Sequence, residues 1–248
     1  MDIDDTITSN GIIPSHAFEA LWLLHEAGFK LVPVTGRPAG WCDHIARMWP
    51  VAGVVGENGG FYFRYDRGKR RMERSYSFDE GELVRFRQGF ERIKNRVLEE
   101  VKGSAVAADQ PFRISDLAID YCEDVVPLSE GDVRKICAIA QEEGATSRVS
   151  SIHVNCWYGD FDKVSCVRRF IEDRTSSPFQ TVCSRILFVG DSHNDEPLFR
   201  EIPLSVGVAN IRNFLHFIDH LPSYITEKES AGGFRELADF LHERKAHP

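Results

Sequence analysis

Short apolar runs, each followed by a small polar cluster, recur along this chain of 248 residues. Three of the clusters are Thr35-Gly36-Arg37, Glu57-Asn58-Gly59-Gly60 and Gly190-Asp191. Helical patterns separate the apolar runs, over residues 14–27, 38–48, 163–172 and 196–201. Alternation of short buried strands with helices indicates a parallel sheet covered by helices on both faces. We therefore predict an α/β fold with a Rossmann-like core that binds ligands at the carboxyl ends of its strands.

The middle of the chain follows a different pattern from its two ends. Core strands are expected over residues 29–34, 53–56, 186–189, 204–208 and 224–225, with a terminal helix over 233–243. Between them we expect a hairpin over 61–65 and 71–76, helices over 79–101 and 129–143, and strands over 117–121 and 148–157. This antiparallel α+β pattern predicts an inserted cap domain over residues 61–157. The core is then discontinuous, over residues 1–60 and 158–248.

The composition narrows the classes of partner. A formal net charge of −8 weighs against a nucleic-acid-binding protein, which usually carries a basic face. The six cysteines include no C-x-x-C pair, which favours free thiols in a reducing compartment. No apolar stretch is long enough for a membrane span, and no secretory signal is recognisable. We predict a cytoplasmic protein whose partner is a small molecule, with neither nucleic acid nor membrane; the oligomeric state stays open.

Acidic residues gather at two points far apart in the sequence. Asp2 and Asp4 stand near the start, while Asp191 and Asp195 follow the apolar run 186–189. In an extended strand, residues two apart point to the same side, so Asp2 and Asp4 can face one substrate. Mg²⁺ prefers oxygen ligands, and Lys163 offers a compact positive charge to a phosphate. The pattern predicts a site for one Mg²⁺ and one phosphate.

The ordered set of motifs resembles the haloacid dehalogenase superfamily of phosphohydrolases. Asp2-Ile3-Asp4-Asp5-Thr6 is similar to its first motif, Thr35 to its second, Lys163 to its third and Gly190-Asp191-Ser192-His193-Asn194-Asp195 to its fourth. An insertion between the second and third motifs resembles the C2-capped subgroup, which includes Cof-like sugar phosphatases and sucrose-phosphate phosphatases. The resemblance implies a Mg²⁺-dependent phosphomonoester hydrolase with an aspartyl-phosphate intermediate. Its substrate is then a small phosphorylated metabolite, such as a sugar or sugar-acid phosphate.

The resemblance also implies a role for each motif residue. Asp2 is the expected nucleophile, and Asp4 the expected general acid and base. The metal ligands are then Asp2, Asp4 through its backbone carbonyl, Asp191 and Asp195. The expected phosphate-binding groups are Thr35, Gly36, Lys163 and Asn194.

Substrate specificity is expected to come from the cap and the second motif. Ser151, His153 and Asn155 alternate with apolar residues, so one face of their strand is polar and could look toward the leaving group or toward solvent. Arg37 is a further candidate. Two related functions stay open: a phosphosugar mutase or phosphotransferase of the same superfamily, and an inactive phospho-ligand-binding protein. A receiver-like phospho-acceptor module is disfavoured because such modules are shorter and have no cap.

The start of the chain departs from the superfamily pattern. Its members carry several apolar residues before the first aspartate, and these residues form the central strand of the sheet. Here only Met1 precedes Asp2. We therefore expect the native chain to begin upstream of this sequence.

Overall fold

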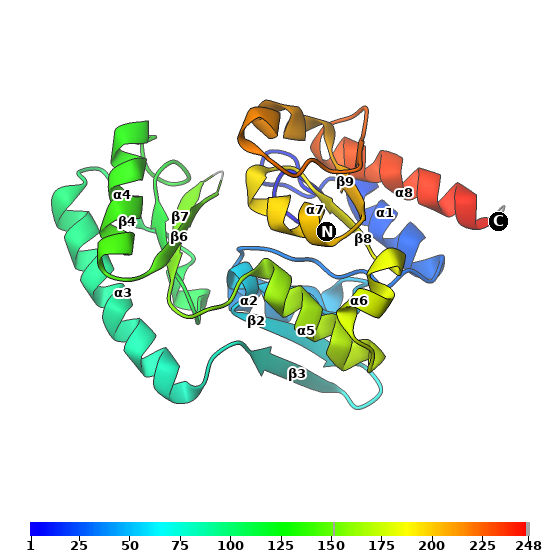
Figure 1. The fold of residues 1–248 in the computed structure, drawn as a ribbon, viewed down its shortest axis with the longest axis horizontal. Helices are drawn as coiled ribbons and strands as arrows, with labels where there is room; N and C mark the ends of the chain where they lie inside the picture. Colours follow the sequence, from blue (N-terminus) through cyan, green and yellow to red (C-terminus); the bar gives the residue numbers. More distant parts are fainter. Residues whose placement is uncertain (151, 247–248) are drawn as a thin grey trace.

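Two bodies, a core and a cap, lie side by side in the structure, a computed structural model that describes residues 1–150 and 152–246 (Figure 1). The chain leaves the core after residue 76, forms the cap, and returns to the core before residue 163. Ser151, one of the expected cap residues, lies outside the described residues.

In the core sheet, the start of the chain lies between one segment that is far downstream in the sequence and another that is close to it. Strands β8 (Leu187–Gly190), β9 (Leu204–Gly207) and β10 (Tyr224–Ile225) are parallel, in the order β10-β9-β8. Beside β8, the Asp2 N–H donates to the Val189 carbonyl at 2.8 Å. On the other side, the Val34 N–H donates to the Met1 carbonyl at 2.8 Å, and Val34 forms a parallel bridge with Val55. The first residues therefore occupy the centre of the core.

A second set of strands extends this layer. Strand β1 (Val54–Gly56) pairs antiparallel with β2 (Phe61–Asp66), which pairs with β3 (Arg71–Tyr76) as the predicted hairpin. Phe61 and Phe63 are buried in the same apolar cluster as core residues such as Ile3. The hairpin thus packs with the core, whereas a cap boundary at residue 61 was expected. We propose that the boundary lies near Phe78, because strand pairing and apolar burial hold residues 61–76 to the core.

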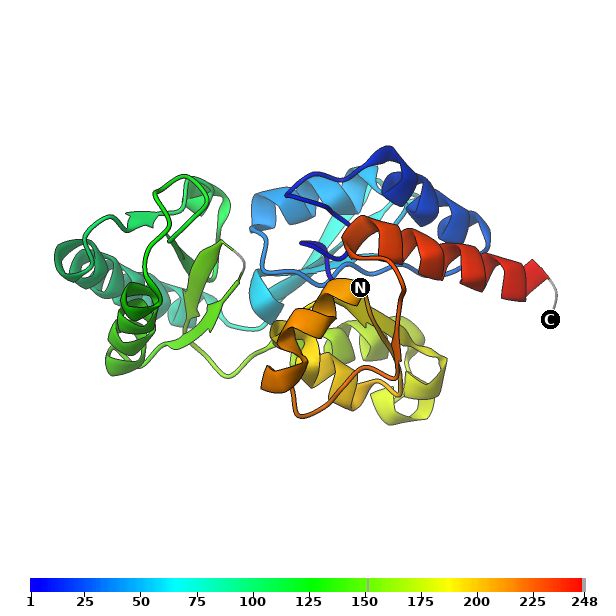
Figure 2. The ribbon, with the colours of Figure 1, turned by 90° about the horizontal axis from the view of Figure 1, so that it is seen from above.

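Helices cover both faces of the core, as the alternation predicted. One apolar cluster joins Val54, Phe63 and Val189 to α1 (Ser15–Glu26), α2 (Ala39–Met48) and α8 (Ser230–Ala246). The other joins Val55, Tyr62 and Phe188 to α5 (Lys163–Thr175), α6 (Phe179–Val182) and α7 (Glu196–Glu201). Adjacent strand residues enter opposite clusters because side chains alternate along a strand. Figure 2 shows α1 and α8, in blue and red, across the layer from the yellow helices.

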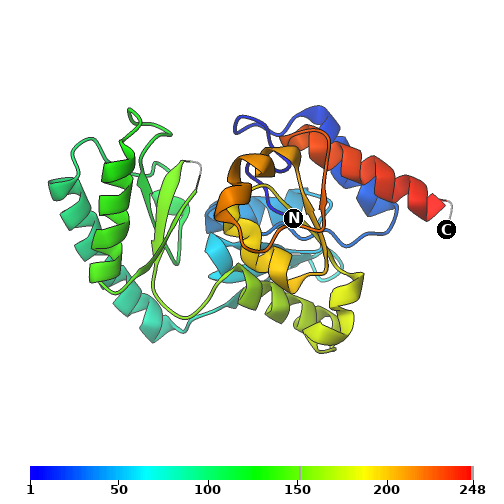
Figure 3. The ribbon, with the colours of Figure 1, turned by 45° about the horizontal axis from the view of Figure 1, so that its top comes forward.

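The cap is one antiparallel sheet with two helices on its outer face. The sheet order is β4 (Ala105–Val106), β5 (Leu117–Asp120), β7 (His153–Trp157) and β6 (Thr146–Val149). Helices α3 (Glu80–Glu100) and α4 (Glu130–Glu142) pack on Ile119, Val154 and Cys156. Both helices lie away from the core, so the other face of the sheet looks toward it (Figures 1 and 3).

Most predicted elements are confirmed, and one is altered for a visible reason. Short 3₁₀ helices, not predicted, cover Glu57–Gly59, Gln110–Phe112, Cys183–Arg185, His193–Asp195 and Ala209–Phe217. The strand expected over 29–34 is extended chain with a single bridge at Val34. Pro33 has no N–H to donate, although its carbonyl accepts from Val55 at 2.9 Å.

Within the described residues, no helix is long and apolar enough to cross a membrane.

Glycine at position 59 permits the turn between β1 and β2 to approach the start of helix α5 closely. Gly59 has φ +104°, and a Cβ there would lie 2.0 Å from the Asp162 carbonyl oxygen. Gly144, after α4, has φ +79° but no atom within 4 Å of such a Cβ. Gly144→Ala should cost about 1–2 kcal/mol of unfolding free energy from its left-handed backbone alone. Gly59→Ala should cost at least about 2 kcal/mol more, measured by urea denaturation, because backbone must shift. Equal losses would contradict this view of Gly59.

Candidate active site

Three carboxylates, one from the start of the chain and two from the loop after β8, meet at the carboxyl end of this strand. Side-chain oxygens of Asp2, Asp191 and Asp195 all lie within 4.8 Å of one another, and all three residues are buried. The Lys163 Nζ, at the start of α5, donates to Asp2 Oδ1 and Asp195 Oδ1, each at 3.0 Å. The structure therefore brings together residues from the first, third and fourth predicted motifs.

The loop after β8 is shaped around Asp195. Its Oδ2 accepts the backbone N–H of Asp191 at 3.1 Å, and a Cβ at Gly190 would lie 2.4 Å from that same oxygen. Only glycine therefore allows the strand end to pass this close to the Asp195 side chain. Asp195 orders the loop in addition to facing Lys163.

Asp191 is oriented by two side chains, of which one was not predicted. The Thr6 hydroxyl donates to Asp191 Oδ1 at 3.0 Å, and Asn210 Nδ2 lies 3.3 Å from Oδ2. Asn210 also donates to the Asp5 carbonyl at 3.1 Å and accepts from the Ser230 N–H at 2.9 Å. Its only signal in the sequence is its place just after the predicted strand 204–208, at the edge of the sheet where ligands bind.

The cluster holds more negative than positive charge. Burial, together with the neighbouring Asp195 and Asp4, raises the pKa of Asp2 to about 7, although Lys163 acts in the opposite direction. Burial and the nearby carboxylates also raise the pKa of Asp191. Burial disfavours the charge on Lys163, but Asp195 and Asp2 outweigh it and raise the lysine pKa. Three carboxylates around one ammonium group fit a divalent cation with oxygen ligands, such as Mg²⁺.

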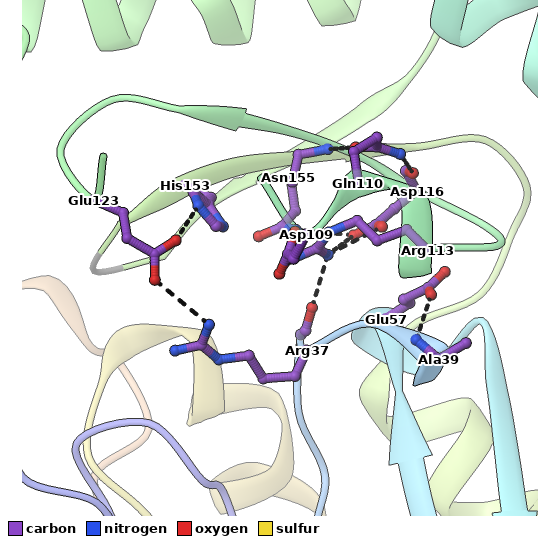
Figure 4. Close-up of polar contacts among 12 residues, drawn as sticks. Arg37, Ala39, Glu57, Asp109, Gln110, Arg113, Asp116, Glu123, His153 and Asn155 are labelled. Carbon is purple, nitrogen blue, oxygen red and sulfur yellow. Dashed lines mark hydrogen bonds and ion pairs between the residues drawn. The ribbon is translucent and has the colours of Figure 1, made fainter. Parts of the chain in front are cut away.

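The side chain of Asp4 lies apart from this cluster and is held by Arg37. Arg37 Nε lies 3.1 Å from both Asp4 carboxylate oxygens, and Nη2 lies 2.8 Å from Oδ1. The guanidinium also stacks on the Trp41 ring at 4.6 Å. Its Nη1 is 3.8 Å from Oε1 of Glu123 in the cap, and Glu123 Oε2 is 2.8 Å from His153 Nε2 (Figure 4). Arg37, expected to contact substrate, thus links Asp4 to the cap.

The expected phosphate-binding residues differ in their accessibility. Thr35 is fully buried, and its hydroxyl oxygen accepts the Arg37 N–H at 3.0 Å within the loop. Gly36 lines the cavity between cap and core, and its carbonyl accepts from Arg113 Nη1 at 3.0 Å. Asn194 Nδ2 donates to the Val149 carbonyl of the cap at 2.8 Å. The Asn194 amide is therefore engaged by the cap in this arrangement.

The cavity between the two bodies has a volume of about 510 Å³. Asp2, Asp4, Lys163 and Asp191 line it from the core, while His153 and Asn155 line it from the cap. The polar face of the predicted strand 148–157 therefore looks toward the acidic cluster. A cavity of this size holds a small metabolite.

Glu57, a buried carboxylate in one of the polar clusters of the sequence to which no role was assigned, joins the cap to the core. Glu57 accepts the N–H of Ala39, at the start of α2, at 2.9 Å (Figure 4). It also accepts the N–H of Ser115 at 2.5 Å and the Ser115 hydroxyl at 2.6 Å, and an N–H from Ile114. Burial and the nearby Asp116 raise the Glu57 pKa to about 7, despite these hydrogen bonds. Glu57 thus connects the second motif, α2 and the cap.

Comparison with known proteins agrees with this architecture. No protein-family model matches the chain. A phosphoglycolate phosphatase from Methanobrevibacter smithii is 25% identical over 224 residues, covering 87% of this chain and 86% of that protein. A solved structure from Thermoplasma acidophilum gives a TM-score of 0.73 at 18% identity, covering 98% and 96% of the two chains. Sucrose-phosphatase from Synechocystis sp. PCC6803 gives 0.63 at 16% identity, covering 96% and 95%.

The fold is that of the haloacid dehalogenase superfamily, with an inserted α+β cap. This confirms the fold class and the resemblance to Cof-like and sucrose-phosphatase-like phosphatases. A haloacid dehalogenase-like hydrolase from Bacteroides thetaiotaomicron gives a TM-score of 0.67 at 15% identity, covering 97% of both chains. The sequence relative and several structural relatives are named phosphatases, in agreement with the predicted class of enzyme.

The raised pKa of Asp2 gives the acidic cluster a pH signature. Burial favours the protonated form of Asp2. The contribution of protonated Asp2 to the stability of the metal-free fold is therefore complete below its unfolded-state pKa of 3.8, and it is lost as the pH rises through the folded-state pKa of about 7. A divalent cation bound by the Asp2 carboxylate would reverse this loss. We expect Mg²⁺ to raise the melting temperature by several degrees at about pH 7.5 and by less than half as much at about pH 5. A shift that does not depend on pH would contradict this.

Proposed function

We propose that the chain is a Mg²⁺-dependent phosphomonoester hydrolase that acts on a small phosphorylated metabolite through an aspartyl-phosphate. The observation that carries this proposal is the buried cluster of Asp2, Asp191 and Asp195 around Lys163, open to a cavity under the cap. Asp2, Asp191, Asp195 and the Asp4 carbonyl would hold Mg²⁺. The bound ion would reduce the repulsion between the phosphate dianion and an attacking carboxylate.

The proposed reaction has two steps at Asp2. A carboxylate oxygen of Asp2 attacks phosphorus, the ester P–O bond breaks, and Asp4 gives its proton to the departing alkoxide. Water then attacks the aspartyl-phosphate while Asp4 accepts a proton, which releases phosphate and restores Asp2. Lys163, 3.0 Å from Asp2 Oδ1, orients the nucleophile and offsets phosphate charge. Gly36 and Thr35 would orient the phosphoryl oxygens.

The relatives differ in the substrate that their names give. One is named for phosphoglycolate, another for sucrose phosphate, and a third is related to trehalose-6-phosphate phosphatase. Their common feature is a phosphate monoester of a small polar metabolite, which supports a sugar or sugar-acid phosphate here. Cys42, Cys137, Cys156, Cys166 and Cys183 are free thiols, which supports the proposed cytoplasmic location.

Phosphate release from a panel of metabolites tests the proposal directly. Asp2→Asn should lower the release rate at least about 10³-fold, because an amide cannot form the intermediate. Asp160→Asn, at an exposed position, is the matched control and should keep full activity. EDTA should stop release by the unaltered protein, and Mg²⁺ should restore it. Interconversion of sugar-phosphate isomers without phosphate release would favour a mutase. If Asp2→Asn kept more than about a tenth of the activity of the unaltered protein, Asp2 would be excluded as the nucleophile.

The contacts of Arg37 with Asp4 lead to a separate expectation about the leaving group. Arg37→Gln should let Asp4 move and lower kcat for an alkyl phosphate by about 10²-fold. The loss should be smaller for p-nitrophenyl phosphate, whose leaving group departs without a proton. Arg47→Gln is the control, because Arg47 is exposed and pairs with Asp43 on α2. Equal losses with both substrates would show that Arg37 acts otherwise than through Asp4.

A further inference from the structure

The register of the cap sheet places Arg148 on the surface that faces the core. Asn155 of β7 lies opposite Arg148 of β6 and opposite Ala118 of β5. Directly paired residues in an antiparallel sheet project to the same face. The adjacent Val154 and Cys156 project to the other face, where α3 and α4 pack. Arg148 therefore shares the face of Asn155, and its exposed side chain lines the cavity.

Charge is distributed unevenly around this cavity. The core lines it with the carboxylates of Asp2, Asp4, Asp5 and Asp191, and with Arg37 and Lys163, which pair with carboxylates of the core. The cap lines it with Arg113, Arg148 and His153, and with no carboxylate among the described residues. The carboxylates of the core face the proposed metal and phosphate, so the cap side of the cavity faces whatever the phosphate is attached to.

Among the arginine and lysine side chains that line the cavity in the described part of the chain, Arg148 stands apart. Lys163 pairs with Asp2 and Asp195, and Arg37 pairs with Asp4. Arg113 pairs with Asp109 and Asp116, and its side chain is almost fully buried. Arg148 forms no ion pair or side-chain hydrogen bond with any described residue. Its guanidinium keeps all five N–H donors for a ligand.

The strand that carries Arg148 is fixed to the loop of the acidic cluster. The carbonyl of the next residue, Val149, accepts from Asn194 Nδ2 at 2.8 Å. Asn194 is adjacent to Asp195, so this hydrogen bond ties the end of β6 to the proposed metal-binding loop. A substrate whose phosphate lies at Asp2 therefore extends toward the cap surface that includes Arg148.

We propose that Arg148 binds a carboxylate on the alcohol part of the substrate, so that the enzyme prefers phosphate esters of small hydroxy acids to those of neutral sugars. This rests on the proposed phosphatase function. A guanidinium forms two parallel hydrogen bonds with a carboxylate. A second phosphate would also be anionic, but its double charge exceeds that of Arg148, the one unpaired arginine or lysine that the described residues contribute to this surface. A carboxylate matches that charge.

Three two-carbon esters of equal size test the proposal: phosphoglycolate, 2-hydroxyethyl phosphate and phosphoethanolamine, with ethylene glycol bisphosphate as the arm for a second phosphate. We expect kcat/KM to favour phosphoglycolate over 2-hydroxyethyl phosphate by about 10–100-fold. Arg148→Gln should remove most of this preference, chiefly through KM. Arg148→Glu should favour the amine over the acid. Arg134→Gln, on the outer helix α4 and 74% exposed at its side chain, is the control and should change nothing.

Three results would overturn the proposal, and a separate measurement tests the phosphatase function on which it rests. Equal use of acid and neutral esters would overturn it, as would a preference for the bisphosphate that depends on Arg148. An equal loss for all esters in Arg148→Gln would show a structural role instead. Calorimetry with Mg²⁺ and the Asp2→Asn variant measures binding without turnover. Phosphoglycolate should bind the double variant Asp2→Asn with Arg148→Gln more weakly than it binds Asp2→Asn alone. If the protein releases no phosphate from the two-carbon esters and none from p-nitrophenyl phosphate, the proposed phosphatase function fails, and not only the selectivity.

Discussion

The charge balance between Lys163 and the carboxylates of Asp2 and Asp195 constrains the rest of this structure. Buried ionised groups are tolerated only when opposite charge and hydrogen bonds surround them. Lys163 starts α5, Asp2 lies beside β8, and Asp195 follows β8, so these distant segments must meet at one edge of the sheet. The single lysine leaves negative charge unbalanced, and a divalent cation fits that remainder.

The cap is joined to this centre mainly through polar groups of the motif loops. Arg113 donates to the Gly36 carbonyl, Asn194 to the Val149 carbonyl, and Ser115 donates to Glu57. Water can replace such hydrogen bonds at a modest net cost, unlike a buried apolar interface. The position of the cap and the geometry of the motif loops are therefore coupled, and under the proposed function these hydrogen bonds would be exchanged with water when substrate enters.

Local sequence signals predicted most of the fold because helix periodicity and apolar runs are short-range properties. Capping residues mark the starts of α3 and α4, where Asp79 and Ser129 accept backbone N–H groups. The hairpin of β2 and β3 was predicted as an element but placed in the cap. Its proposed place in the core rests on pairing with β1 and on burial of Phe61 and Phe63, which are non-local.

The sequence by itself determined the chemical types at the site: four carboxylates, one lysine and a hydroxyl. The tertiary structure decided how they are divided, with Asp2, Asp191 and Asp195 in one cluster and Asp4 on Arg37. The packed chain also places Asn210 next to Asp191 and Glu57 next to Ser115 of the cap, and it leaves Arg148 without an ion pair to any described residue. The physical reason is that residue spacing fixes which side of a strand or helix a group occupies, whereas its partners depend on segments that only the packed chain brings within hydrogen-bonding distance.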